Sequence, residues 1–191
     1  MSGILSFISK RFVAGEDFDQ ALNAVRSLNS RKISTTLDIL GENVSNQEEA
    51  KAKADAYLNV VDGINKSGVE SHVSLKLTQM GLDVSDDFCF ENVSRIFERA
   101  KQYNNFVRVD MEGSGYAERT LQLVYRWHEL YPNMGTVIQA MLHRSISDIL
   151  ELNRRKIRVR LCKGAYKEPP IVAIQEKKHV NENFVKLMQM L

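Results

Sequence analysis

The sequence predicts an α/β protein of the (βα)8 TIM-barrel type, here with about five βα units, and three observations lead to this prediction. Five short runs rich in β-branched residues alternate with longer amphipathic stretches, and a helix-length connection allows successive strands to pair in parallel. Polar residues stand at or near the end of every run, which is where barrels build their sites. The composition, 43% hydrophobic and 26% charged with no linker-like tract, indicates one domain over residues 1–191.

The predicted elements follow one another in a regular order. The strands are expected over 33–40, 72–77, 106–111, 135–140 and 157–162. Helical patterns lie between them, over 46–68, 91–103, 116–131 and 144–156. The first of these helices has Asn46 as a candidate N-cap and Gly68 just beyond its end. Near the C-terminus, Met188 and Met190 fit an apolar helix face and are expected in the core.

An N-terminal helical arm is expected over residues 1–32. Its stretch "ILSFISKRF" is weakly basic and amphipathic, as a transit peptide would be, but Glu16, Asp17 and Asp19 follow at once. Because transit peptides are poor in acidic residues, we favour a short helix packed on the body of the protein.

The polar residues at the strand ends favour a barrel over an open doubly wound sheet, which would gather them at one switch point. They are Asp38, Glu42, Lys76, Asp110, Gln139, Arg160 and Lys163. Each has an ordinary explanation when taken alone, since a cation often snorkels to solvent and a buried amide needs only a partner. Their recurrence at the same end of five strands favours one shared site.

Composition excludes several classes of protein. The formal net charge of +2 gives no reason to expect a nucleic-acid partner or more than peripheral attachment to a membrane. Two cysteines without metal or disulfide spacing indicate a reducing compartment, and the four histidines show no metal-binding spacing. "GSGYAE" lacks the third glycine of a phosphate-binding loop and is expected to be a turn that caps a helix.

Six motifs, in order, resemble proline dehydrogenases of the single-function bacterial type: "RFVAGE", "TLDILGE", "SLKLTQMG", "VRVDME", "TVIQAML" and "VRLCKGAYKEP". The resemblance implies a distorted (βα)8 barrel that binds FAD. It also implies oxidation of L-proline to Δ1-pyrroline-5-carboxylate, the first step of proline catabolism, with electrons passed to a membrane quinone. The implied location is the cytoplasm, with at most peripheral attachment at the inner face of the membrane.

The resemblance also implies roles for individual residues. Lys76 would bind the substrate carboxylate, and Asp110 would lie beside the reacting centre and the flavin. Gln139, Arg160 and Lys163 would line the flavin, with Arg160 near its N5 edge, where a permanent cation stabilises the charge of the reduced ring.

Two further expectations concern carboxylates. Glu42 matches a residue that, in the family, closes the site by pairing with an arginine of the last helix. Asp110 is not expected to be the general base, because neighbouring cations lower the pKa of a carboxyl group.

Two alternatives remain open from the sequence. Lys163 or Lys76 could form a Schiff base in an aldolase-like barrel. The chain could instead be a non-catalytic split-barrel fragment that docks to a complementary piece. A barrel of this type needs about 250 residues, and the later family motifs lie beyond the sequence. We therefore expect the 191 residues by themselves to be incomplete, to lack activity and to self-associate through exposed strand edges.

Overall fold

A computed structural model describes residues 13–41 and 43–191 of the chain. The helix expected over "ILSFISKRF" lies outside the described residues. In the described part, the five predicted strands are present and form one parallel sheet in the order β1-β2-β3-β4-β5. The strands are β1 (Thr35–Leu37), β2 (Ser71–Leu75), β3 (Val107–Val109), β4 (Met134–Gln139) and β5 (Arg158–Cys162). This arrangement is half of an α/β barrel.

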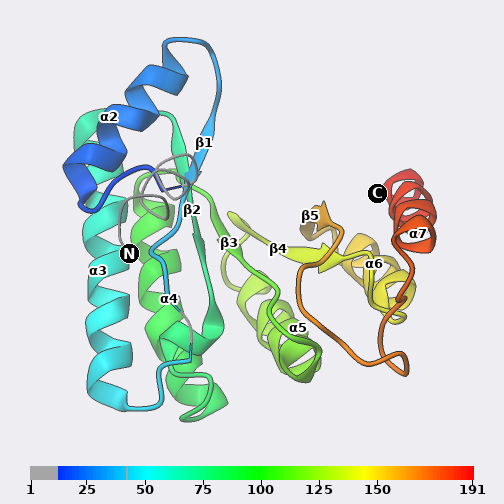
Figure 1. Ribbon diagram of the computed structural model, residues 1–191. Helices are drawn as coiled ribbons and strands as arrows, with labels where there is room; N and C mark the ends of the chain where they lie inside the picture. Colours follow the sequence, from blue (N-terminus) through cyan, green and yellow to red (C-terminus); the bar gives the residue numbers. More distant parts are fainter. Residues whose placement is uncertain (1–12, 42) are drawn as a thin grey trace, which may run out of the picture.

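The helices follow the sheet from one edge to the other (Figure 1). They are α2 (Phe18–Asn29), α3 (Gln47–Ser67), α4 (Asp86–Gln102), α5 (Ser114–His128), α6 (Ser145–Arg154) and α7 (Lys177–Met190). A short 3-10 helix, η1 (Leu77–Met80), follows β2 and was not predicted. None of the helices in the described ranges is both long enough and apolar enough to cross a membrane.

Capping residues explain where two of the helices begin. The Asn46 side chain accepts a hydrogen bond from Glu49 N at 2.8 Å, and Gly68 ends α3 with a φ of 64°, so the predicted boundaries of α3 are confirmed. The prediction for α4 was about one turn short. Ser85 accepts a hydrogen bond from Phe88 N at 3.1 Å and starts the helix at Asp86, upstream of the expected residue 91.

One hydrophobic core joins the sheet to the helices that cover it. Its largest fully buried side chains are Trp127, Tyr57 and Phe97, from α5, α3 and α4. The prediction that Met188 lies in the core is wrong, because this residue is 54% exposed on α7. Met190 is half-buried and packs against the core, as expected.

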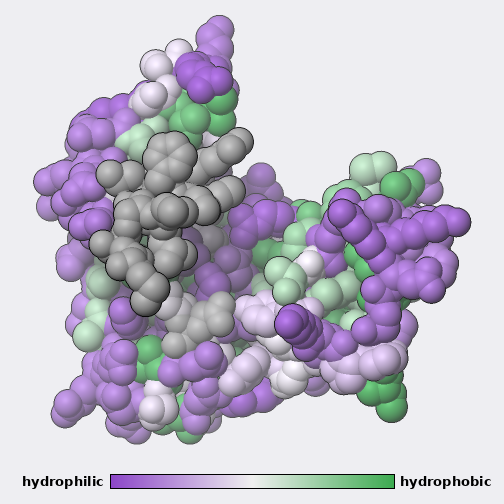
Figure 2. Space-filling model, in the orientation of Figure 1, coloured by the Kyte–Doolittle hydropathy of each residue, from purple (hydrophilic) through white to green (hydrophobic). Residues whose placement is uncertain are grey.

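The strand register decides which residues share the inner face of the sheet, opposite the helices. Thr36 pairs with His72, Ser74 with Arg108, and Gly135 with Arg158. Side chains alternate along a strand, so the residues that stand two or four positions after these paired residues lie on the same face of the sheet. These residues stand at the strand ends. Figure 2 shows a broad hollow between the part of the molecule built on α3 and α4 and the part built on α6 and α7.

Candidate functional site

A row of four residues crosses the inner face near the carboxyl ends of the strands. Leu75 pairs with Val109, Val109 with Thr136, and Val137 with Arg160. Lys76 follows Leu75, and Asp110 follows Val109. Lys76, Asp110, Val137 and Arg160 therefore lie level with one another across the sheet. Arg160 reaches past the small Val137 side chain, and its Nη2 donates a hydrogen bond to Asp110 Oδ1. The structure thus brings together three of the residues predicted from the strand ends.

Lys76 lies between two carboxylates. Its Nζ donates to Asp38 Oδ2 at 2.7 Å and lies 3.9 Å from Asp110 Oδ2. Tyr57, fully buried on α3, donates its hydroxyl proton to Asp38 Oδ1 at 2.8 Å. Burial and the Asp38 charge raise the Tyr57 pKa, so the hydroxyl is a permanent donor at neutral pH. Asp38 is therefore held from two sides and keeps the Lys76 ammonium in place.

The electrostatic environment of Asp110 corrects one expectation. The cations Arg160 and Lys76 act to lower the pKa of this carboxyl group, but burial acts more strongly in the opposite direction, and Asp38 adds to it. The pKa of Asp110 is consequently raised above its ordinary value, not lowered. A depressed pKa therefore does not exclude Asp110 as a general base.

A second row, one layer further from the strand ends, carries two more arginines. The guanidinium groups of Arg108 and Arg158 lie over the Phe106 ring, with 5.0 Å and 4.6 Å between each Cζ and the ring centroid. Gly135 separates the two arginines, and a Cβ there would lie 2.4 Å from the Arg158 carbonyl oxygen. Burial, followed by the charge of Arg160, lowers the pKa of Arg108 to about 10. The layer beneath Asp110 is therefore strongly cationic.

Gln139 ends β4 as a buried amide. Its Nε2 donates to the carbonyl oxygens of Met111 and Glu112 at 3.0 Å each. Its Oε1 has no hydrogen-bond partner among the described residues, although it is buried. A buried acceptor without a partner is costly, and the imide N–H of a flavin is a suitable donor for it. The Gln139 environment therefore fits the cofactor that the resemblance implies.

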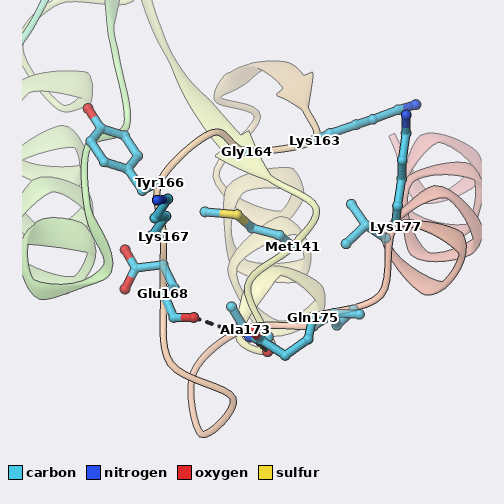
Figure 3. Close-up of a pocket in the computed structure, with 11 residues that line it drawn as sticks. Met141, Lys163, Gly164, Tyr166, Lys167, Glu168, Ala173, Gln175 and Lys177 are labelled. Carbon is cyan, nitrogen blue, oxygen red and sulfur yellow. Dashed lines mark hydrogen bonds between the residues drawn. The ribbon is translucent and has the colours of Figure 1, made fainter.

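A pocket of about 560 Å³ lies beyond the end of β5. Figure 3 shows Lys163 and Lys177 on one side of this pocket, and Tyr166, Lys167 and Glu168 on the other. Lys163 begins the loop after β5, while Lys177 is the first residue of α7. Three lysines against one carboxylate make the lining cationic, which suits the phosphate groups of a dinucleotide.

Glu42 lies outside the described residues. Glu112, which follows β3, is 3% exposed and accepts hydrogen bonds from Thr78 N (3.1 Å) and Thr78 Oγ1. Gly113 caps α5 as expected. Within the described ranges, histidines, cysteines and carboxylates form no group able to hold a metal.

Tyr57 could not be recognised from its sequence context, because an aromatic residue on an amphipathic helix normally indicates core packing. Asp38 was recognised as a strand-end residue, but its role as the Lys76 partner was not. The position of Asp38 could have indicated this role, because Asp38 follows β1 in the same way that Lys76 follows β2 and Asp110 follows β3.

Comparison with known proteins identifies relatives of this chain. The proline dehydrogenase family model matches residues 21–184. Proline dehydrogenase 2 of Bacillus subtilis (strain 168) is 36% identical over 179 residues, 94% of this chain and 59% of that protein. Proline dehydrogenase of Deinococcus radiodurans is 32% identical over 188 residues, 95% of this chain and 60% of that protein. The chain thus spans about three-fifths of the length of these relatives.

Solved structures show the same fold. A crystal structure of proline utilization A (PutA) from Bdellovibrio bacteriovorus, inactivated by N-propargylglycine, superimposes with a TM-score of 0.84. The sequences are 24% identical, and the match covers 95% of this chain and 24% of that one. The parallel half-barrel therefore has the same fold as part of that structure. Together with the family match over residues 21–184, these findings show that the chain belongs to the proline dehydrogenase family.

Proposed function

We propose that this chain forms the first five βα units of a flavin-dependent enzyme that oxidises L-proline to Δ1-pyrroline-5-carboxylate and passes the electrons to a membrane quinone. Family membership supports proline as the substrate. The observation that carries the proposal is the row in which Lys76, Asp110 and Arg160 meet on the inner face. We place the enzyme in the cytoplasm, at most peripherally at the inner face of the membrane.

Lys76 would bind the carboxylate of proline. Its ammonium group is held by Asp38 at 2.7 Å, so its position is fixed before the substrate arrives. An anchored carboxylate fixes the ring, so that the carbon next to the amine can be presented to the cofactor. That carbon gives up a hydride, the nitrogen lone pair forms the C=N bond, and the amine proton passes to solvent.

FAD would supply a hydride acceptor, and the described residues could hold it at three points. Gln139 Oε1 offers an acceptor to the flavin imide. Arg160 brings a cation to the ring edge, and its charge stabilises the electron-rich reduced form without reorganisation. Lys163 faces the cationic pocket, where the phosphate groups would lie. Asp110 orients Arg160 through their hydrogen bond.

The Schiff-base alternative receives less support from the geometry. Lys76 is engaged as a cation between Asp38 and Asp110, whereas a Schiff base needs a neutral amine. Lys163 lies 6.0 Å from the Phe184 ring centroid and in a pocket with other lysines. Borohydride trapping with a carbonyl substrate would label Lys163 if this alternative were correct.

Anaerobic titration with L-proline tests the proposal. The longer polypeptide that contains this segment should purify with FAD, and L-proline should bleach the visible absorbance of the flavin. D-proline, with its carboxylate on the opposite side of the ring, is the control and should bleach it far more slowly. A flavin that keeps its visible absorbance in excess L-proline would refute the proposal.

A further inference from the structure

The loop between β5 and α7 carries Lys163 and Tyr166 into the pocket. Its first residue is fixed, because Met141 N donates to the Lys163 carbonyl oxygen at 2.9 Å. Its later part is also fixed, because Ile174 N donates to the Met141 carbonyl oxygen at 2.8 Å. The section around Tyr166 lies between these two anchors, and a further restraint there would hold its position.

Glu168 supplies that restraint. Its Oε1 accepts a hydrogen bond from Ser114 N and its Oε2 accepts one from Ser114 Oγ, both at 2.6 Å. Figure 3 shows the carboxylate of Glu168 turned away from Met141, which lies in the middle of the pocket. The contact ties the loop after β5 to the start of α5, across 54 residues of sequence.

The start of α5 depends on this contact for its capping. Gly113, the N-cap residue, has no side chain to accept a hydrogen bond, and no acidic residue stands in the first turn. By contrast, α3 and α4 begin with their own caps, Asn46 and Ser85. Glu168 therefore gives α5 both the acceptor and the negative charge that a helix start favours.

We propose that Glu168 is a positioning residue, whose contact with Ser114 holds the loop that carries Lys163 and Tyr166 and thereby sets the shape of the cofactor pocket. This inference rests on the flavin site proposed above. Both carboxylate oxygens of Glu168 are engaged by Ser114, so Glu168 would act through the loop. The contact joins the connection after β3 to the connection after β5, so the two sides of the proposed site are built as one unit.

The experiment compares Glu168→Ala, Glu168→Gln and the double variant Glu168→Ala with Ser114→Ala, each made in the longer polypeptide that contains this segment. Glu176→Ala is the matched control, because it removes the same charge from the same loop and its side chain is 72% exposed. FAD affinity is measured by quenching of flavin fluorescence. Hydrogen exchange of the backbone amides of residues 114 and 165–168 is measured in the same variants without FAD.

Glu168→Ala should raise the dissociation constant for FAD about tenfold, the usual effect of one charge-assisted hydrogen bond. Glu168→Gln should stay within about threefold of the original protein, because an amide can accept from Ser114 N and donate to Ser114 Oγ. Adding Ser114→Ala to Glu168→Ala should cause little further loss, since Glu168→Ala already removes the acceptor of both Ser114 hydrogen bonds. Glu176→Ala should leave the affinity unchanged.

The possible failures are distinguishable. If Glu168→Ala speeds exchange at α5 but leaves FAD affinity unchanged, Glu168 is only a helix cap and the inference is wrong. If the unmodified protein binds no FAD, the proposed function fails, and exchange alone decides about the contact. Faster exchange at Tyr166 and Lys167 in Glu168→Ala than in Glu176→Ala would then support the restraint, and equal exchange would overturn it.

Discussion

The Nζ atom of Lys76 lies 2.7 Å from Oδ2 of Asp38, and this ion pair joins the ends of β1 and β2 on the inner face of the sheet. Only 18% of the Lys76 side chain and 25% of the Asp38 side chain are exposed. Solvent therefore screens the pair less than it screens a surface ion pair. The hydroxyl of Tyr57 binds the other carboxylate oxygen, so removal of Asp38 would take the nearest partner from both Lys76 and Tyr57.

Asp38→Ala should lower the free energy of unfolding by about 2 to 3 kcal/mol, since it removes the nearest acceptor of a partly buried cation and of a buried hydroxyl. Urea denaturation measures this loss. Asp55→Ala is the control, because Asp55 pairs with Arg95 on the surface, with 57% and 47% of their side chains exposed. That variant should lose less than about 1 kcal/mol. Equal losses would mean that Asp38 contributes no more than a surface carboxylate.

Tyr57→Phe tests the buried end of the same network. The change removes the donor to Asp38 Oδ1 and the acceptor for Ile39 N, at 2.8 Å and 3.1 Å. We expect a loss of about 1 to 3 kcal/mol in urea denaturation, because the backbone N–H and the carboxylate both lose a partner. Tyr125→Phe keeps the ring that stacks on Arg155 and should change the free energy by less than about 0.5 kcal/mol. An unchanged free energy of unfolding in the Tyr57→Phe variant would contradict this network.

The pKa of Asp110 predicts an unusual pH dependence. Because burial raises this pKa above 3.8, the folded state holds the proton more tightly than the unfolded state does. The stabilisation is fully present below pH 3.8 and is lost as the pH rises through the raised pKa. Relative to Asp110→Asn, the original protein should therefore lose stability in urea denaturation as the pH rises above 3.8 and through the raised pKa.

Asp62 gives the control of opposite sign. Its hydrogen bond with Arg99 lowers its pKa, so its contribution is present above the unfolded value and is lost as the pH falls. The difference between the original protein and Asp62→Asn should stay constant from about pH 4 to pH 7 and shrink below that range. If the Asp110→Asn comparison instead favoured the original protein increasingly as the pH rose, Arg160 and Lys76 would outweigh burial.

Arg160→Met tests the cation at the proposed flavin edge. Methionine keeps much of the length and apolar character of the side chain but removes its charge. In the longer polypeptide that contains this segment, we expect the rate of flavin reduction by L-proline to fall about a hundredfold. This corresponds to a barrier higher by about 3 kcal/mol, as for loss of one electrostatic contact in an active site. Stopped-flow absorbance measures this rate.

Arg158→Met is the matched control for Arg160→Met. Arg158 lies on the same strand and face, but its guanidinium stacks on Phe106 one layer further from the strand ends. Its removal should slow flavin reduction less than about threefold. A near-normal rate in a folded Arg160→Met variant would show that Arg160 is an ordinary cation that extends to solvent.

The sequence predicted the sheet and its row of polar residues because both follow from repeating geometry. Alternation within a strand and parallel pairing between strands bring Lys76, Asp110 and Arg160 to one face without any detailed knowledge of the loops. The contact between Glu168 and Ser114 was not predictable in this way, because it depends on the path of a 14-residue loop between β5 and α7. The sign of the Asp110 pKa shift was also unpredictable, because burial and charge oppose each other and only the folded structure gives their relative size.

The edges of the sheet lead to the last prediction. Among residues 13–41 and 43–191, β1 pairs only with β2, and β5 only with β4, so each edge strand has one row of backbone groups outside this ladder. β4 is buried along its whole length, whereas Arg158 on β5 is exposed and the rest of β5 is half-buried. Such edges favour pairing with another chain.

Exposed apolar residues lie close to the β5 edge. Val185 and Met188 on α7, and Leu191 directly after it, follow at three-residue spacing and are 48%, 54% and 52% exposed. Three-residue spacing places side chains on one side of a helix, so these residues form an apolar stripe. The stripe and the edge strand belong to the same part of the chain, since α7 contacts β5.

Residues 1–191 expressed as a separate polypeptide should therefore self-associate. In sedimentation velocity, the apparent mass should exceed that of the 21.8 kDa chain and rise with concentration. Val185→Lys combined with Met188→Lys should shift the protein toward the monomer, because two charges on the stripe oppose its burial. Leu150→Lys is the control, since Leu150 is 59% exposed on α6, and it should leave the association unchanged. A protein that stays monomeric at every attainable concentration would show that neither the β5 edge nor the α7 stripe is adhesive.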